Sequence, residues 1–337
     1  TGAQGYESTR QRLEVQGQHL RSTVNGARYQ IGRLELASLA DLRQRAQANP
    51  TLNGDFGLQV VQGNVRTLHA QPEYAGALFQ VASQFNLLEM VGPNITPEHG
   101  VTRYAGDPTQ GPACAIAAGA ATIYRNYFAK VADQVGQTRA RQLDGFAEFG
   151  QAIAQALGKK PGQLWTMRNG YALFNASAAV DQVSDYIQDL DEAGRAALRQ
   201  MLRIGLHWDV EVTDAPTSPG PLVSQAFCSA LPVAYNHFER DQAPQWAPLA
   251  SLVLEAAYEA TLWAAVIQAQ QGGSNKVLLT SLGGGVFGND ERWIRAAISR
   301  AVAAVRGHGL EVVLVSFRPP TAEWLTWAKA LAGHSHA

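Results

Sequence analysis

The chain has 337 residues, of which 46% are hydrophobic, and its formal net charge at pH 7 is -1. This length is enough for one large α/β domain with insertions or for two ordinary domains. The nearly neutral charge gives no electrostatic reason to expect nucleic acid or an anionic membrane surface as a partner.

The cysteine and histidine content excludes two further classes. The two cysteines, Cys114 and Cys228, lie in apolar segments, which argues against a disulfide scaffold and against a cysteine-rich zinc site. The histidines lack the spacing of metal ligands, so we expect neither a metal nor a cofactor. The chain has no apolar run of about 18 residues, and its polar first 18 residues do not resemble a secretion signal. We therefore expect a cytoplasmic protein with no membrane segment.

The first half of the chain begins with an arm and continues with alternating elements. Residues 1–35 are rich in Gln, Arg and Gly and predict an N-terminal arm. Residues 38–49 start with a capping serine and predict a helix. The apolar runs 58–61 and 77–82 predict buried strands. A long loop rich in Pro and Gly follows, and the small residues of 114–131 then predict a tightly packed helix.

Residues 139–212 have a different character and predict a helical insertion. Helices are expected over 141–157, 176–190 and 192–206, and Asn169-Gly170 predicts a hairpin between the first two. This division leaves 36–138 and 213–337 as the α/β core.

The last third of the chain returns to strands that alternate with helices. Strands are predicted over 222–235, with a bend near Pro232, and over 276–282 and 310–317; helices are predicted over 249–268 and 290–309. Such alternation predicts a mostly parallel sheet covered on both faces, in which ligands bind at the carboxyl ends of the strands.

A glycine-rich loop, "LGGGVFGND", lies between the predicted strand 276–282 and the helix that follows it. Glycines permit close approach of a ligand to the backbone, and free amides beside a helix start favour a diphosphate. A phosphate loop of the GxxxxGK[ST] type is excluded because Asn289-Asp290 stands at its end. Gly283, Gly285 and Gly288 have the spacing of a dinucleotide fingerprint, but His308 occupies the position expected for an acidic residue.

Several segments together resemble the macrodomain family, in particular the branch similar to poly(ADP-ribose) glycohydrolases. These are "LLTSLGGGVFGND", "WIRAAISRAV" and "LEVVLVSF", preceded in the same order by "LQVVQGNVRTL", "ALFQVASQFNLLEM" and "VSQAFCSALPVAYN". The resemblance covers about residues 57–130 and 220–318. It implies a macrodomain-like three-layer α/β/α fold with a mixed sheet, an N-terminal extension and a largely helical insertion.

The resemblance implies a set of ADP-ribose contacts. Gly63 and Asn64 match the Gly-Asp pair that contacts adenine; Asn64 departs from the acid, although its amide oxygen can accept a hydrogen bond. Other matched positions lie beside the distal ribose and the diphosphate. They are Ser83, Gln84 and Asn86 beside the ribose, and Gly283, Gly284, Gly285, Val286, Phe287, Gly288 and Asn289 at the diphosphate. Gly111, just before a predicted helix of small residues, is expected to open the helix start to the diphosphate.

The predicted catalytic loop departs from the family pattern. Poly(ADP-ribose) glycohydrolases carry adjacent glutamates there, whereas this chain has "GVTRYAGDPTQGPACA" over 100–115. Asp107 and Gln110 are the candidates to orient water or a ribose hydroxyl, although "GDPT" is equally typical of a turn that opens a helix. Glu89, Arg103 and Arg125 and the pair Glu98-His99 are weaker candidates for ligand contact.

These observations predict an ADP-ribosyl glycohydrolase that cleaves the distal-ribose glycosidic bond of an ADP-ribosylated protein or of a related nucleotide derived from NAD metabolism. A non-catalytic module that binds ADP-ribose or a nucleotide signal is the alternative, and a dinucleotide-dependent oxidoreductase is a third reading. The leaving group, the pathway and the oligomeric state stay open.

Overall fold

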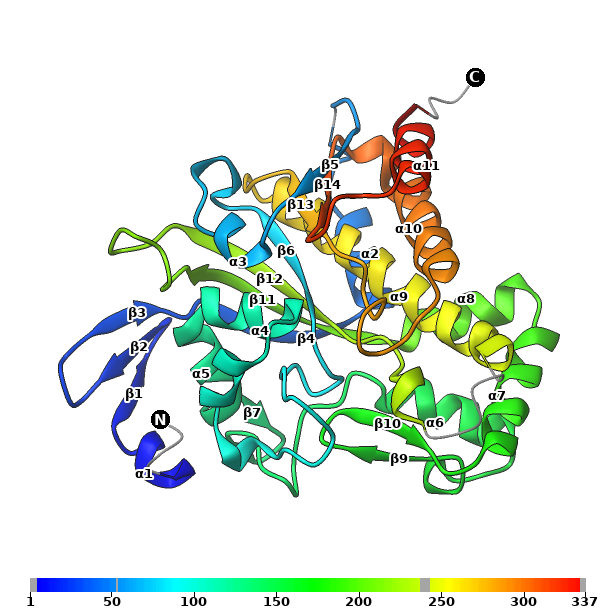
Figure 1. The fold of residues 1–337 in the computed structure, drawn as a ribbon, viewed down its shortest axis with the longest axis horizontal. Helices are drawn as coiled ribbons and strands as arrows, with labels where there is room; N and C mark the ends of the chain where they lie inside the picture. Colours follow the sequence, from blue (N-terminus) through cyan, green and yellow to red (C-terminus); the bar gives the residue numbers. More distant parts are fainter. Residues whose placement is uncertain (1–4, 53, 237–242, 334–337) are drawn as a thin grey trace.

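A seven-stranded mixed sheet forms the centre of the protein, whose computed structural model describes residues 5–52, 54–236 and 243–333 (Figure 1). The strands from β12 to β5 run parallel, whereas β4 and β11 pair antiparallel. In sheet order the strands are β4 (Arg33–Ser38), β11 (Arg203–Glu211), β12 (Leu222–Cys228), β6 (Leu78–Ala82), β13 (Lys276–Leu279), β14 (Glu311–Ser316) and β5 (Gly57–Gln62).

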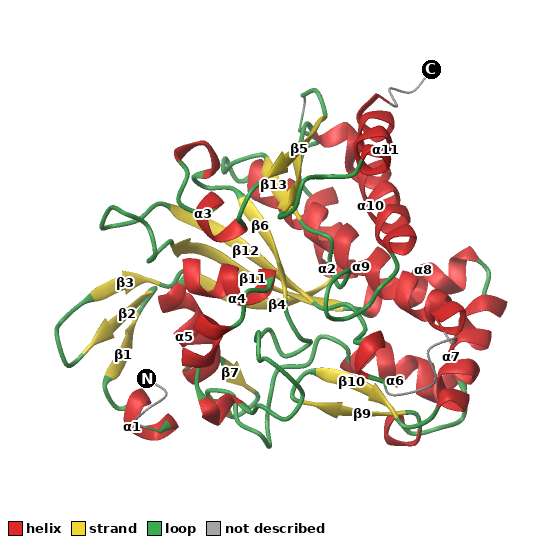
Figure 2. Ribbon diagram, in the orientation of Figure 1, coloured by secondary structure: helices red, strands yellow, loops and turns green. Residues whose placement is uncertain are grey.

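Helices cover both faces of this sheet (Figure 2). Neighbouring residues of one strand enter different cores: Leu78 joins the core beneath α9, and Phe79 joins the core beneath α4 and α5. This alternation is expected for strands buried on both faces. The first layer holds α2 (Leu39–Gln47), α9 (Ala243–Gln270) and α10 (Glu291–Val305); the second holds α3 (Val65–Leu68), α4 (Gln110–Ala117) and α5 (Gly119–Tyr127). The predicted three-layer α/β/α fold with a mixed sheet is confirmed.

One helix is long and apolar enough to cross a membrane by length and composition. This helix is α9, and in its most apolar stretch of 18 residues, within Gln245–Gln270, 89% of the residues are buried inside the protein. α9 packs against α2, α7 and α10 and against the sheet, which is the position of a core helix.

The predicted helical insertion differs from the structure at its end. Its helices are α6 (Ala147–Ala156), α7 (Ser177–Asp189) and α8 (Glu192–Met201), and its hairpin joins β9 (Trp165–Arg168) to β10 (Tyr171–Phe174). Asn169 and Gly170 both have positive φ, as the predicted two-residue turn requires. The helix predicted over 192–206 instead ends at Met201, because the following residues form β11 and pair with β4 and β12. The core sheet therefore begins again before the predicted boundary at 212.

The N-terminal arm also contains more structure than its composition predicts. After α1 (Tyr6–Arg10), the strands β1 (Leu13–Gln16), β2 (His19–Ser22) and β3 (Arg28–Gln30) form a small antiparallel sheet. Leu20 and Ile31 pack with Ala120 of α5, which ties the arm to the second helical layer.

The remaining elements are short. The helix predicted over 114–131 is broken into α4 and α5 at Ala118, whose ψ of 59° is not helical, and Thr213 Oγ1 accepts the amide of Gly119 at the break. α11 (Ala322–Gly333) packs near β5. The others are β7 (Lys130–Val131), β8 (Gln134–Val135), η2 (Pro72–Tyr74), η3 (Pro97–His99), η4 (Thr102–Gly106), η5 (Pro161–Gln163), η6 (Val233–Tyr235) and η8 (Arg306–His308).

Candidate functional site

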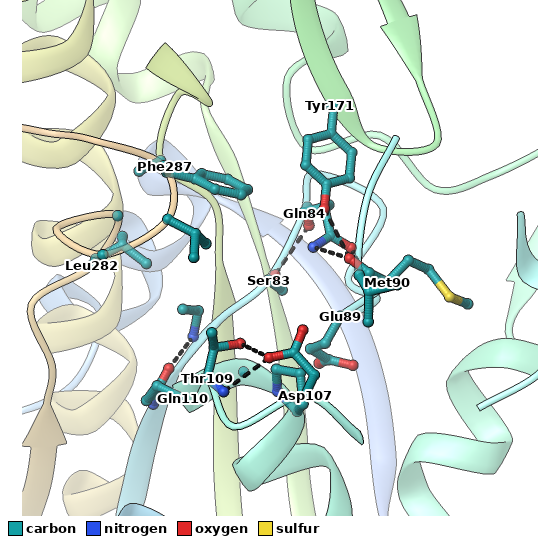
Figure 3. Close-up of a pocket in the computed structure, with 18 of the residues that line it drawn as sticks. Ser83, Gln84, Glu89, Met90, Asp107, Thr109, Gln110, Tyr171, Leu282 and Phe287 are labelled. Atoms are coloured by element: carbon teal, nitrogen blue, oxygen red, sulfur yellow. Dashed lines mark hydrogen bonds between the residues drawn. The ribbon is translucent and has the colours of Figure 1, made fainter. Parts of the chain in front are cut away.

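A cavity of about 670 Å³ lies at the carboxyl ends of β6, β12 and β13 (Figure 3). This is the edge of a parallel sheet at which ligands bind in α/β proteins, and the volume suits an organic ligand. The walls come from segments far apart in the sequence. They are residues 82–84 and 89–91 at and after the end of β6, 106–112 at the start of α4, Ala230 and Tyr235 after β12, 281–283 and 285–287 after β13, and Tyr171 of the hairpin.

The glycine loop after β13 contributes unpaired backbone amides to this cavity. Gly283, Gly285, Val286 and Phe287 line the cavity, and their amides donate no hydrogen bond to any residue that the structure describes. The loop is held by other bonds, from Gly284 N to Ser281 O and from Gly288 N to Gly285 O. A run of free amides in a turn is a binding site for an anion.

Only some of the glycines are explained by the fold. Gly283 and Gly288 have φ near +73° and +72°, which disfavours other residues. A Cβ on Gly284 would lie 3.0 Å from Ile294 Cδ1. A Cβ on Gly285 would meet no atom within 4 Å, and its φ is not positive. The bare backbone at Gly285 therefore leaves room for a ligand and satisfies no internal contact.

The glycine loop also borders a second, smaller cavity. Gly284 and Asn289, with Ser316 at the end of β14, line this space of about 240 Å³. The Asn289 amide nitrogen donates to Leu231 O, while its buried Oδ1 has no partner among the described residues. Six of the predicted loop residues therefore divide between two cavities, and Gly288 lines neither.

The polar segment after β6 is largely occupied by internal hydrogen bonds. Ser83 and Gln84 line the large cavity as predicted, and the Gln84 side chain bonds both the amide and the carbonyl of Met90. Asn86 is buried away from the cavity: its side chain donates to Gln142 and accepts from Leu88 N. Asn86 therefore shapes the loop, and the structure does not bring it to the ligand cavity.

The loop before α4 brings the predicted catalytic residues to the cavity wall. Asp107 Oδ1 accepts from Thr109 N at 2.9 Å and from Thr109 Oγ1 at 2.6 Å, whereas Oδ2 accepts from no described residue. Gln110 is fully used: Oε1 accepts Ala82 N, and Nε2 donates to Gln80 O. Gln110 thus pairs with backbone groups near the end of β6, and both polar atoms of its side chain are engaged within the fold.

Gly111 lines the cavity for a reason different from the predicted one. A Cβ at this position would lie 2.0 Å from Ala82 O and 3.1 Å from Glu89 Cγ. The glycine lets the start of α4 pack directly on the segment after β6.

Glu89, one of the weaker candidates for ligand contact in the sequence, lines the large cavity. Its side chain is buried and forms an ion pair with Arg125, whose terminal nitrogen NH2 lies 3.1 Å from Glu89 Oε1. Burial raises the pKa of Glu89 to about 7, although Arg125 acts in the opposite direction. Arg125, also a weaker candidate for ligand contact in the sequence, is completely buried and lines none of the cavities described.

Aromatic side chains close the opposite side of the cavity. Phe287 packs against Tyr171 and Tyr235, with ring centroids 5.5 and 5.6 Å apart. Figure 3 shows Phe287 and Tyr171 on the side away from Asp107 and Thr109. This apolar wall faces the polar wall made by the residues before α4.

Other predicted contacts lie outside the large cavity. Gly63 and Asn64 follow the edge strand β5; Asn64 Oδ1 caps α3 by accepting Arg66 N, so the oxygen proposed for adenine is already in use. Glu98 and His99 line a separate cavity with Arg139 and Arg168. Arg103 lies in η4 and lines none of the cavities described. No group of three or more His, Cys, Asp or Glu residues suited to a metal ion occurs in residues 5–52, 54–236 and 243–333.

Phe317 is a residue that the sequence does not single out. It directly follows β14, at the carboxyl edge of the sheet, and is 71% exposed. The neighbouring Ser316 lines the smaller cavity, so Phe317 lies close to that space. An aromatic residue at the carboxyl end of a parallel strand could have been recognised as a candidate for ligand contact once the strand order was known.

Comparison with known proteins gives likenesses to solved structures only. No family model and no curated protein matches the chain. The chain is similar to poly(ADP-ribose) glycohydrolase from Deinococcus radiodurans in complex with ADP-ribose, at 14% identity and a TM-score of 0.46, over 88% of this chain and 93% of that one. It is similar to the enzyme from Thermomonospora curvata at 13% identity and a TM-score of 0.46, over 97% and 94% of the two chains. The Thermomonospora curvata structure with the inhibitor ADP-HPD gives 13% identity and a TM-score of 0.44.

These structures are of the kind that the sequence resemblance names. Identities and TM-scores of this size assign neither a family nor an activity to the chain.

Proposed function

We propose that this protein binds ADP-ribose and hydrolyses the glycosidic bond at C1″ of the distal ribose in an ADP-ribosylated molecule. The observation that carries the proposal is the meeting, in one cavity, of unpaired loop amides with the carboxyl groups of Asp107 and Glu89. The amides suit a diphosphate, and paired carboxyl groups are the usual equipment for cleaving a glycosidic bond.

The glycine loop supplies the binding part of this function. The diphosphate lies against the amides of Gly285, Val286 and Phe287, where no Cβ at Gly285 blocks it. No Lys, Arg or His lines the cavity among the described residues, so neutral backbone dipoles rather than cations hold the anion. The distal ribose extends into the large cavity, and the adenosine end extends toward the smaller one, near Phe317.

Asp107 supplies the polar group that orients water. Thr109 fixes Oδ1 by two hydrogen bonds, so the free Oδ2 has a defined direction. A carboxylate held in this way positions a water molecule for attack on C1″ and stabilises the positive charge that develops on the sugar.

Binding without turnover is the second candidate function, and one observation favours it. Residues 100–115, where the resemblance implies adjacent glutamates, contain no glutamate, and the helix start there consists of Gln110, Gly111 and Pro112. Gln110 is bonded to β6, and the other two residues have no ionisable side chain. If Asp107 and Glu89 take no part in catalysis, the protein binds ADP-ribose without hydrolysing it.

Two measurements on the purified protein separate these functions. Calorimetry with ADP-ribose tests binding, and release of ADP-ribose from mono- and poly-ADP-ribosylated proteins tests hydrolysis. Binding of ADP-ribose without its release from ADP-ribosylated proteins supports the second function, binding without turnover. No binding of ADP-ribose removes both functions, and a preference for NAD over ADP-ribose favours the oxidoreductase reading. The variant Asp107→Asn is the catalytic control, because it keeps the size of the side chain and loses its charge.

A further inference from the structure

We propose that a third cavity, between η3 and the β9–β10 hairpin, binds an acidic segment of the protein that carries the ADP-ribose, and that Arg139 and Arg168 hold the carboxylates of this segment. We call this space the hairpin cavity. The inference rests on the proposed function, because it assigns a docking surface to the part of the substrate beyond the distal ribose. It adds a preference for acidic sequences around the modified residue.

Three segments far apart in the sequence build the hairpin cavity, whose volume is about 440 Å³. They are the loop after β6, the loop after β8 and the β9–β10 hairpin. Hydrogen bonds between side chains and backbone fasten them together: Asn169 Nδ2 donates to Pro93 O at 2.7 Å, and Arg139 N donates to Glu98 Oε1 at 2.7 Å. The walls are therefore held in place without the guanidinium groups of the two arginines.

The two arginines place unpaired positive charge in this cavity. Neither guanidinium group forms an ion pair or a hydrogen bond with any residue that the structure describes. The ionised lining groups are two arginines and one glutamate, Glu98, which leaves one net positive charge when His99 is neutral. Arginine clusters with free guanidinium groups are a common means of binding acidic peptide motifs. The hairpin cavity therefore suits a carboxylate.

The large cavity has the opposite charge. Its walls contain Asp107 and Glu89 and, among the described residues, no Lys, Arg or His. A carboxylate on the substrate protein is therefore repelled by the acids of the large cavity and attracted to the arginines of the hairpin cavity.

One short stretch of chain takes part in both cavities. Val91 lines the large cavity, and Asn94 lines the hairpin cavity. Their Cα atoms are separated by three residue steps of about 3.8 Å, or at most about 11 Å. The hairpin also reaches both: Tyr171 lines the large cavity and bonds Met90 O, whereas Arg168 lines the hairpin cavity (Figure 3). An extended peptide advances about 3.3–3.6 Å per residue, so a carboxylate about three or four residues from the modified residue reaches the arginines.

The lining of the hairpin cavity favours a peptide over a second ADP-ribose unit. A diphosphate would bring two negative charges against Glu98, whereas a peptide offers backbone N–H groups that the second carboxyl oxygen of Glu98 can accept. No Phe, Tyr or Trp lines this cavity among the described residues, so an adenine base has no aromatic ring on which to stack.

Direct binding tests the hairpin cavity without any turnover. A fluorescent, unmodified peptide with several aspartates is titrated with the protein in about 50 mM salt, where charge attraction is weakly screened. We expect Arg139→Ala combined with Arg168→Ala to weaken binding by about tenfold, and higher salt to weaken binding of the wild-type protein. Thermal unfolding should not change, because neither guanidinium group is bonded within the described structure.

Arg28→Ala is the matched control for loss of charge. Arg28 lies in β3, outside the hairpin cavity, and its guanidinium group also has no partner among the described residues. We expect this variant to bind the acidic peptide as the wild-type protein does.

Two peptides that are ADP-ribosylated on the same serine test the effect on the substrate. One has aspartates about three and four residues from the serine on both sides, and the other has alanines there. We expect the wild-type protein to release ADP-ribose from the acidic peptide with a kcat/KM about tenfold higher, mainly through a lower KM. The double arginine variant should treat the two peptides alike.

Equal affinity of the wild-type protein and the double variant for the acidic peptide, or no binding by the wild-type protein, would overturn the inference. A loss confined to release from poly-ADP-ribosylated protein would also overturn it, because the cavity would then bind a second ADP-ribose unit. The proposed function fails in a different way. Arginine-dependent binding of the unmodified peptide, without release of ADP-ribose from any modified peptide or protein, would keep the docking surface and remove the hydrolase.

Discussion

The glycine loop after β13 and the loop before α4 form different walls of one cavity, and they use their polar groups in opposite ways. The first leaves the amides of Gly283, Gly285, Val286 and Phe287 unpaired. The second directs Gln110 to the backbone of β6 and Asp107 Oδ1 to Thr109. Unpaired polar groups cost free energy unless water or a ligand satisfies them, so the first loop is open to such a partner, whereas Gln110 in the second loop is used within the fold and Asp107 keeps Oδ2 free among the described residues.

Two glycines test this comparison most directly, and Gly111 gives the larger effect on the fold. The Cβ of Gly111→Ala would overlap Ala82 O, and we expect the variant to lose about 3 kcal/mol of unfolding free energy. Chemical denaturation measures the loss. Unchanged stability would show that α4 does not need close contact with the segment after β6.

Gly285→Val should affect binding and leave the fold intact. A Cβ at Gly285 meets no atom within 4 Å, so we expect normal thermal unfolding together with ADP-ribose affinity weakened by about 100-fold, or about 2.7 kcal/mol. Gly307→Val is the matched control, because its Cβ also meets nothing and Gly307 lies in η8, outside the cavity walls. Normal affinity in Gly285→Val would place the diphosphate elsewhere.

Gln110→Ala should separate support from binding in the second loop. The variant leaves Ala82 N and Gln80 O without their partner, and we expect a loss of about 2 kcal/mol of stability. The ADP-ribose affinity of the folded variant should change by less than about threefold. Gln110→Glu keeps the acceptor for Ala82 N, so its unfolding free energy should lie between those of the wild-type protein and Gln110→Ala. A loss of catalysis without a loss of stability in both variants would assign Gln110 a catalytic role.

Phe317→Ala gives the smallest expected effect. The exposed ring can stack on an adenine base, and its removal should weaken ADP-ribose binding by about tenfold, or about 1.4 kcal/mol. Binding of ribose 5-phosphate, which has no base, should not change. A decrease in stability instead of affinity would mean that Phe317 serves the packing of the sheet edge.

The sequence was informative where local pattern decides the structure. The parallel strands, the Asn169-Gly170 hairpin and the position of the glycine loop all follow from periodicity and turn chemistry over a few residues. The end of α8 was not predicted, because Ile204 and Leu206 lie three and four residues after Met201 and Leu202, as in a helix, while their own separation of two residues fits a strand. The pairing of β11 with β4 and β12 decides between them, and it joins residues far apart in the chain.

The site divides in the same way. The polar residues after β6 were predicted to face a ligand, but Asn86 bonds Gln142 and is buried. The position of the Glu89 side chain in the cavity wall depends on Arg125, 36 residues further along, and on the absence of a side chain at Gly111. No local pattern contains that information, because the burial that raises the pKa of Glu89 arises from three separate segments.

The β9–β10 hairpin fastens the insertion to the segment that carries Glu89. Phe85 N donates to Gly170 O, the Asn169 side chain donates to Pro93 O, and the Tyr171 hydroxyl donates to Met90 O. The insertion is therefore not a detachable module: removing it would expose the buried backbone after β6 and release the cavity wall. We expect the hairpin and this wall to open together, as one cooperative unit, in native-state hydrogen exchange.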